Sequence, residues 1–464
     1  MEKSATDNNL LQFHGAWWFA LLPFLVFLGG VITVALSGAP DERGFWPFLL
    51  LALAVGLLLA KNKTRYAEAV LSGMSEKIVM IMITAWILAS CIGVLMTSTG
   101  FVEALIWLAA QLNLGGVGYI VVALIICCIV SLSTGSSFAT ILICGPILYP
   151  AGGLLGSHLP TLAGAIIGGA TFGDFFAPIS DTTISSALSQ NAPIGPTVKS
   201  RLKYILPATL LAVLAYTANA YFLAPSTLTN GESLQGDPSG LPMLLVPAYI
   251  IFLFLRGRHL LHGLLQGLLV GTILGFVLGL LPVDRIFSLD LDNFGAKSFI
   301  IDGINRSVGI SFFTILLMGL VGTIKASGLM DRLVALATSR SKTAVQAEGW
   351  IAATVGAAVL LTTHSIVAIL MVADFAKETG EARELSPIRR SNILSMVVCF
   401  FPFYLPYFIP VILMANTTQS GAEFGIPAVT VLEAGLYNFV ALFLFLISIV
   451  SITLGYGRRR DQGL

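Results

Sequence analysis

Apolar runs long enough to cross a membrane recur along the chain. A transmembrane helix needs about 20 consecutive, mostly apolar residues, and residues 17–36, 78–96 and 204–223 form three such runs. Only 11% of the 464 residues are charged and 56% are hydrophobic, whereas a soluble domain carries about 25% charged residues. The sequence therefore predicts an all-α, polytopic membrane protein.

Short basic stretches between the runs predict the orientation of the chain in the membrane. Loops rich in Lys and Arg stay on the cytoplasmic side, and Lys61, Lys63 and Arg65 follow the second run. The N-terminus is then cytoplasmic, and so is the C-terminal stretch Arg458–Arg460. Two further basic loops are expected, one with Lys199, Arg201 and Lys203 and one with Arg256, Arg258 and His259. Two external loops are expected at residues 225–240 and 282–306.

Several of the apolar pieces are too short for a regular span. The expected spans and shorter pieces cover residues 17–36, 45–60, 78–96, 100–111, 119–130, a half-length piece that ends within 146–153, 162–170, 204–223, 241–255, 260–281, 310–324, 351–361 and 430–454. Short pieces interrupted by Gly and Pro are typical of the binding regions of secondary transporters.

The second half of the chain resembles the first half. Residues 322–331 echo residues 93–103, and the polar breaks at 133–137 and 362–365 each follow a span and precede a half-length apolar piece. The first copy is expected to start inside, whereas counting spans places Arg306 and the start of the second copy outside. We therefore expect two inverted repeats with broken helices. The expected divisions are N-terminal spans at 1–74, the first repeat at 75–224, connecting spans at 225–304, and the second repeat with the last span at 305–464.

The stretch from Gly173 to Thr183 places two carboxylates where a membrane span should be. Pro178 prevents a regular helix there and frees backbone carbonyl groups, and Asp174, Ser180, Asp181 and Thr182 supply further oxygen atoms. Hard oxygen ligands suit Na⁺ or a similar cation, and charged groups within a span are by default functional. A carboxylate that holds either a proton or a cation is sufficient for exchange. The alternative is that Asp181 caps a helix.

The hydroxyl-rich breaks are candidate substrate-binding segments. They comprise Ser133, Thr134, Gly135, Ser136 and Ser137 in the first half and Thr362, Thr363, His364 and Ser365 in the second. Interhelical packing through small polar residues is the alternative. His364 could donate to an anionic substrate, relay a proton or join two helices.

Other function classes lack their motifs. The sequence has no phosphate-binding Walker loop, no nucleophile–base pattern and no redox-cofactor ligand pair. We therefore expect a protein that is not an enzyme and has no cofactor, with energy drawn from ion gradients, and no nucleic-acid partner. The five cysteines lie in apolar segments without metal-ligand spacing. Glu103, Lys325, Asp331 and Asp374 are expected near span ends, whereas Glu433 fits either a helix cap or a cavity.

The stretch 173–183 closely resembles the signature of the NhaC-type Na⁺/H⁺ antiporters, which belong to a wider ion-transporter superfamily. Residues 133–137 with Thr140 are similar to that family's Thr-Gly-hydroxyl motif. The resemblance implies an antiporter of the bacterial cytoplasmic (inner) membrane, with Asp174 and Asp181 as candidate ligands for Na⁺ and H⁺. Our first hypothesis is therefore Na⁺/H⁺ exchange at these aspartates, helped by Ser180, Thr182 and the hydroxyl groups at residues 133–137. It also implies re-entrant hairpins, an elevator movement and a homodimer.

Two departures from that pattern leave the substrate open. Ala177 precedes Pro178 where a hydroxyl residue is expected, and His364 takes the place that Gly135 has in the first half. Relatives of this group exchange malate for lactate or carry amino acids. The alternative function is therefore a Na⁺- or H⁺-coupled transporter or exchanger of a small organic solute, an amino acid or a carboxylate.

Overall fold

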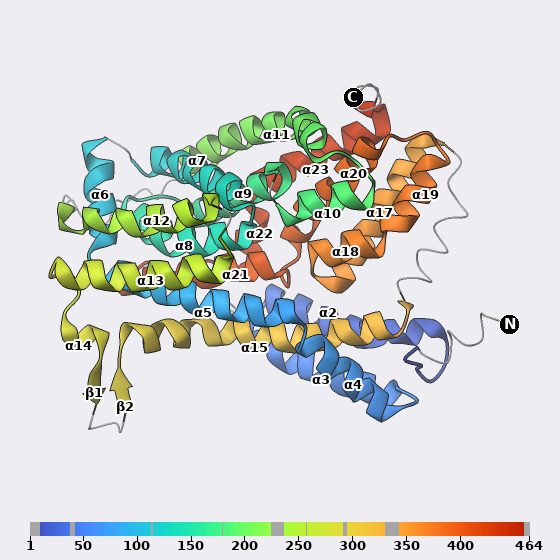
Figure 1. The fold of residues 1–464 in the computed structure, drawn as a ribbon, viewed down its shortest axis with the longest axis horizontal. Helices are drawn as coiled ribbons and strands as arrows, with labels where there is room; N and C mark the ends of the chain where they lie inside the picture. The colour runs from blue at the N-terminus through green and yellow to red at the C-terminus, as the bar shows by residue number, and fades with distance from the viewer. Residues whose placement is uncertain are drawn as a thin grey trace.

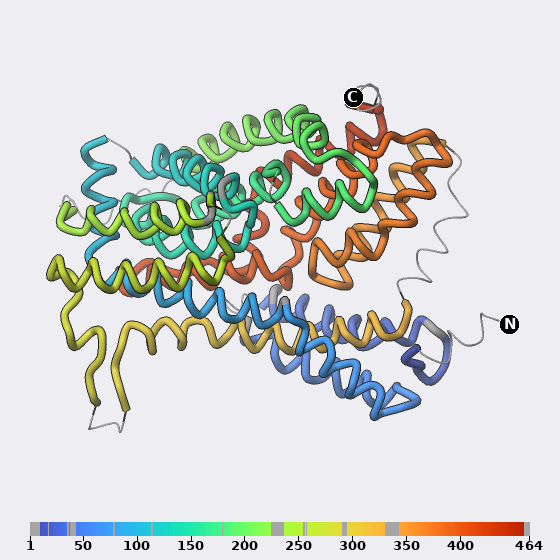
Figure 2. The backbone as a smooth tube through the Cα atoms, in the orientation of Figure 1, coloured from blue at the N-terminus to red at the C-terminus, as the bar shows by residue number. Residues whose placement is uncertain are grey.

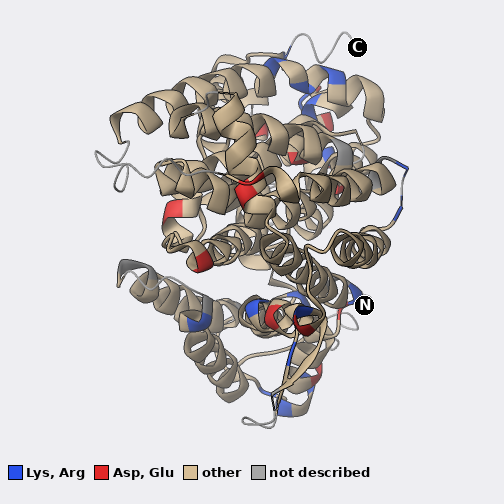
Figure 3. Ribbon diagram, turned by 90° about the vertical axis from the view of Figure 1, so that its left-hand side faces the viewer, with Lys and Arg blue, Asp and Glu red and all other residues tan. Residues whose placement is uncertain are grey.

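The computed structural model describes residues 10–37, 42–112, 115–178, 180–223, 236–256, 258–290, 295–329 and 343–458. Within these ranges, seven helices are long and apolar enough to cross a membrane, or up to nine if each of two bent pairs counts as one span. This confirms the predicted all-α polytopic fold. Figure 3 shows how sparsely Lys, Arg, Asp and Glu interrupt the ribbon.

One group of helices is built around two long, adjacent helices. Figure 1 shows α5 and α15 side by side along the long axis, with α2, α3 and α4 packed near one end. The group consists of η1 (Trp17–Leu21), α2 (Leu22–Leu36), η2 (Glu42–Phe45), α3 (Trp46–Leu59), α4 (Lys63–Met74), α5 (Lys77–Ser98) and α15 (Phe299–Ala326).

A second group holds the predicted breaks. Its first members are α6 (Phe101–Gln111), α7 (Gly116–Thr134), α8 (Ser137–Leu154), α9 (Leu159–Phe176), α10 (Asp181–Ser189) and α11 (Ile194–Phe222). The later members are α17 (Ala344–Thr362), α18 (Ser365–Met371), α19 (Ala373–Glu381), α20 (Pro387–Phe400), η4 (Phe401–Tyr404), α21 (Ile409–Thr417), η5 (Thr418–Phe424), α22 (Val431–Leu436) and α23 (Phe439–Leu454). Helices α10 and α20 pack together, as do α8 and α21, so segments from the two halves of the chain are neighbours.

The middle of the chain connects the two groups. It comprises η3 (Pro238–Leu244), α12 (Leu245–Leu255), α13 (Leu260–Val277), α14 (Val283–Ile286) and the antiparallel strands β1 (Ser288–Asp290) and β2 (Gly295–Lys297). The small hairpin lies in the segment 282–306 that the sequence predicts as a loop. Figure 2 traces the chain from η1 to the end of α23, both in the right-hand half of the view. Orientation in the membrane and the division into four parts stay predictions.

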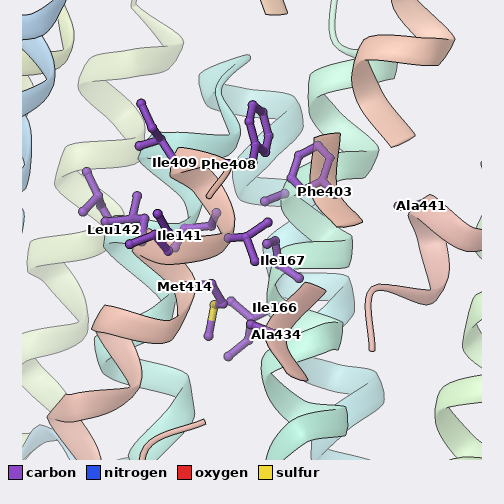
Figure 4. Close-up of a cluster of buried hydrophobic side chains, with 14 of the residues drawn as sticks. Ile141, Leu142, Ile166, Ile167, Phe403, Phe408, Ile409, Met414, Ala434 and Ala441 are labelled. Carbon is purple, nitrogen blue, oxygen red and sulfur yellow. The ribbon is translucent and has the colours of Figure 1, made fainter. Parts of the chain in front are cut away.

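A cluster of buried apolar side chains joins helices from the first and second halves of the chain. Figure 4 shows Ile141 and Leu142 of α8 near Ile409 and Met414 of α21, and all four side chains are buried. The same cluster includes residues of α9, η4, α22 and α23. This cluster packs α8, α9 and α21 against one another, and each of these helices begins or ends at a break.

Several predicted boundaries are wrong, each for a local reason. Helix α8 continues through Pro146 and Pro150 and ends at Leu154, so the expected half-length piece is a helix of 18 residues. Helix α11 begins at Ile194, so the basic residues 199–203 lie in a helix rather than a loop. The last span is broken, because Asn438 caps the N–H of Ala441 at 3.1 Å and begins α23. Asp331 and most of the expected linker 225–240 lie outside the described residues.

Helix α9 approaches α7 closely through a glycine next to Asp174. A Cβ atom on Gly173 would lie 2.1 Å from Ser131 Oγ and 2.4 Å from its backbone carbon. Gly173→Ala is therefore expected to force the helices apart and to lower the free energy of unfolding by about 1–3 kcal/mol. Thermal unfolding in detergent measures the change.

Gly349→Ala is the matched control, because a Cβ there would meet nothing within 4 Å. In the interior of α17 this change is expected to stabilise the protein by about 0.5–1 kcal/mol. Equal effects of the two substitutions would contradict the close packing of α7 and α9.

Candidate functional site

The Asp-Pro-Asp stretch forms a break between α9 and α10. Residue 178 would normally donate its N–H to the carbonyl group of Asp174, but Pro178 has none. Ser180 Oγ and Thr182 Oγ1 donate to that carbonyl oxygen instead, at 2.9 and 2.6 Å. Ala177 has an extended backbone and ends α9, and α10 starts at Asp181. The predicted interruption is confirmed, and its hydroxyls satisfy the carbonyl group that the proline leaves free.

Hydroxyl groups from two separate breaks hold the Asp174 carboxylate. Ser137 Oγ, at the start of α8, donates to Asp174 Oδ2 at 2.7 Å. Ser180 Oγ lies 3.3 Å from Asp174 Oδ1 and 2.8 Å from Thr182 Oγ1. The side chain of Asp174 is half-buried, so the carboxylate is both anchored and accessible.

The two hydroxyl-rich breaks have nearly the same backbone conformation. Gly135 has φ 63° and ψ 21°, and Thr363 has φ 53° and ψ 17°; both end a helix in the left-handed region. The next residues, Ser136 and His364, are extended, with φ −142° and −138°. His364 therefore corresponds to Ser136, and the sequence-based match of His364 with Gly135 is wrong by one residue.

One open pocket brings most of the predicted residues together. It is lined by Gly135, Ser136, Ser137, Phe138, Asp174, Asp181, Thr182, Thr363, His364, Ser365, Ile366, Phe408 and Pro410. Asp181 is exposed and is the first residue of α10, whereas Ser180 occupies the N-cap position, so the alternative that Asp181 caps this helix is wrong. The starts of α8, α10 and α21 surround the pocket, and each contributes the partial positive charge of a helix N-terminus.

The remaining predicted residues lie behind the lining. Thr134 Oγ1 is 3.3 Å from the carbonyl oxygen of Ser136, and Thr362 Oγ1 donates within its own helix to Ala358 at 2.8 Å. Ser180 is buried and does not line the pocket, but its hydroxyl group bonds to Asp174. The side chain of Ser133 is outside the described set. Within the described residues, His364 Nδ1 is buried without a hydrogen-bond partner.

Charged residues outside the pocket have mainly structural contacts. Glu433 forms a capping box with Thr430 at the start of α22. Of the two expected roles for Glu433, the structure therefore shows the helix cap. Lys325 pairs with Glu76 at 2.7 Å. Glu103 and Asp374 lie in the first turns of α6 and α19.

Three buried arginines were missed by the sequence analysis, and one of them, Arg201, contacts the α9–α10 break. Arg201 is fully buried and bonds to both sides of the α9–α10 break, whereas the sequence analysis placed it in a loop. Arg389 and Arg390 are also buried, on α20. The available signal was the presence of charged residues beside an apolar segment, which in a membrane protein favours a specific internal role.

Helices broken around a pocket of carboxylates and hydroxyls are typical of secondary transporters. The model of the Na⁺/H⁺ antiporter family matches residues 6–220, which include the Asp174 break and the Ser133–Ser137 break. The resemblance predicted from the motifs is confirmed over residues 6–220, the part of the chain that is similar to the Na⁺/H⁺ antiporter family.

The chain is also similar, over part of its length, to three curated antiporters. The chain is 24% identical over 246 residues to the malate-2H⁺/Na⁺-lactate antiporter of Bacillus subtilis, covering 51% of this chain and 52% of the relative. It is 29% identical over 186 residues to the Na⁺/H⁺ antiporter NhaC of Alkalihalophilus pseudofirmus, covering 40% of each. It is 35% identical over 111 residues to NhaC of B. subtilis, covering 24% of each. The chain thus matches about half or less of the length of these relatives.

Proposed function

We propose that this protein is an antiporter that exchanges Na⁺ for H⁺ at the pocket containing Asp174. The observation that carries the proposal is the Asp174 carboxylate, held by Ser137 and Ser180 at the meeting point of two helix breaks. Asp181 and Thr182 line the same pocket. Carboxylate and hydroxyl oxygens are ligands that a hard cation prefers.

Exchange follows because a proton and Na⁺ compete for the single negative charge of the Asp174 carboxylate. In its charged form, Asp174 accepts hydrogen bonds from hydroxyl groups, which stabilise its negative charge. A proton or Na⁺ can neutralise this charge, but binding one removes the favourable interaction with the other. Each side of the membrane can then load the site with the ion that is in excess there.

The proposed function also includes how the protein moves, how it assembles and in which membrane it lies. The matching torsions of Gly135 with Thr363 and of Ser136 with His364 support two repeats built on broken helices. An inverted arrangement, an elevator movement, a homodimer and a bacterial cytoplasmic membrane with both termini inside complete the proposal. Lipid, Na⁺ and H⁺ are then its partners, and it is not an enzyme.

Purified protein in proteoliposomes tests the exchange. Adding Na⁺ outside vesicles with an acidic interior should drive protons outward, and a pH-sensitive dye inside the vesicles should report alkalinisation. Adding choline at the same concentration is the control for osmotic and surface effects. Equal responses to Na⁺ and choline would contradict Na⁺/H⁺ exchange.

A carboxylate exchanger is the second candidate, because His364 Nδ1 is buried without a partner beside the pocket in the described structure. An imidazole N–H and helix N-termini both suit an organic anion. One relative is named for the exchange of malate and lactate, so these acids are suitable probes.

His364→Gln separates the two candidates. If the protein carries carboxylates, malate or lactate should raise the melting temperature beyond the effect of Na⁺ alone, and this increment should shrink by at least half in His364→Gln. Gln190→Asn, at a residue that does not line the pocket, is the control substitution. The absence of any increment in the parent protein would exclude malate and lactate and leave Na⁺/H⁺ exchange.

A further inference from the structure

Arg201 is a buried side chain whose donors are completely used. It is 0% exposed, and a guanidinium group offers five N–H donors in a rigid fork. Five acceptors meet them: the carbonyl oxygen of Phe175 at 2.8 Å, Thr183 Oγ1 at 2.8 Å, Ser186 Oγ at 2.9 Å, Ser391 Oγ at 3.4 Å and Asn392 Oδ1 at 3.2 Å. All five are neutral groups.

Two of these acceptors are immediate neighbours of candidate ion ligands. Phe175 follows Asp174 at the end of α9, and Thr183 follows Thr182 in the first turn of α10. One nitrogen atom, Nη1, bonds to both Phe175 and Thr183. The Arg201 guanidinium also lies 5.0 Å from the centre of the Phe175 ring. Arg201 thus joins the two sides of the break at the level of the pocket.

The same side chain connects the break to the second half of the chain. Ser391 and Asn392 belong to α20, and Ser391 Oγ lies 3.3 Å from Ser186 Oγ of α10. Asn392 Nδ2 donates to Ser200 Oγ at 2.7 Å, on the same helix as Arg201. A displacement of α10 relative to α20 would break several of these hydrogen bonds together.

We propose that Arg201 is a positioning residue that sets the spacing between Asp174 and the α10 residues Asp181 and Thr182, and so sets the affinity of the pocket for Na⁺. This inference rests on the proposed function for its ligand. A rigid five-donor fork can hold a carbonyl group and four side chains in one arrangement. A lysine, with three donors on a flexible stem, cannot reproduce that arrangement.

Arg201→Lys tests this role because it keeps the positive charge and removes the fork. The Na⁺ concentration that gives half of the maximal thermal stabilisation should rise about 10- to 100-fold, which is the usual cost of losing a residue that supports ion ligands. The same rise should appear in the KM for Na⁺ in the vesicle assay. Thr183→Val, which removes one acceptor at nearly constant shape, should shift both values in the same direction and decides the question if Arg201→Lys does not fold.

Arg389→Lys is the matched control, since Arg389 is equally buried but is paired with Glu348. It should lower the melting temperature without moving the Na⁺ midpoint. Arg201→Lys or Thr183→Val with the parent midpoint would overturn the positioning role, whatever the loss of stability. A parent protein that shows no response to Na⁺ in either assay would instead contradict the Na⁺ site itself.

Discussion

Asp174→Asn is expected to reduce Na⁺-driven proton movement to the level of protein-free vesicles. Asparagine keeps the size and the hydrogen-bonding capacity of the side chain but can neither carry a negative charge nor release a proton. Ser137 Oγ would still find an oxygen acceptor, so the break should keep its conformation. Because the change removes a partly buried charge, the melting temperature is expected to stay level or to rise.

Two further Asp→Asn substitutions show whether the effect belongs to Asp174. Asp181→Asn should weaken Na⁺ binding but leave measurable exchange, because Asp181 lines the exposed side of the pocket. Asp374→Asn, in the first turn of α19, should leave exchange unchanged. Exchange by Asp174→Asn at the parent rate would rule out Asp174 as the exchange site.

Glu348→Gln is expected to cause the largest loss of stability. Both side-chain oxygens of Glu348 accept from Arg389, at 2.9 and 2.9 Å, and from Arg458, at 2.9 and 2.8 Å. Arg389 and Glu348 are fully buried, and Arg458 is 21% exposed. A neutral amide would leave buried positive charge without its counter-ion, which costs about 3–5 kcal/mol.

A surface pair provides the comparison for Glu348. Glu423 pairs with Arg306, and its side chain is 44% exposed, so Glu423→Gln should cost no more than about 1 kcal/mol. Thermal unfolding of both variants in the same detergent measures the difference. Similar losses of stability for the two substitutions would contradict the view that the ion pairs of Glu348 hold α17 against α20 and against the segment after α23.

The local chemistry of the site could be predicted because it depends on short sequence distances. Pro178 stands four residues after Asp174, so the free carbonyl group and the interrupted helix follow from the sequence alone. Ser180 and Thr182 lie close enough along the chain to satisfy that carbonyl group. The contact between Ser137 and Asp174 could not be derived in this way, since it depends on how α8 packs against α9.

The missed features depend on tertiary packing or on unusual backbone conformations. Lys199, Arg201 and Lys203 have the composition of a cytoplasmic loop, but in a helix alternate residues point in different directions, and Arg201 is buried. Thr363 adopts a left-handed conformation that usually favours glycine. The sequence-based alignment therefore matched Gly135 with His364 and missed Thr363, the residue that actually ends the helix.

Proton release on Na⁺ binding tests the central claim most directly. A carboxylate that exchanges a proton for a cation must lose the proton as the cation binds. Purified parent protein in weakly buffered detergent solution, slightly below neutral pH, should acidify the medium when Na⁺ is added but not when choline is added. Asp174→Asn should release no protons under the same conditions. Na⁺ binding to the parent without proton release, or undiminished release from Asp174→Asn, would contradict exchange at Asp174.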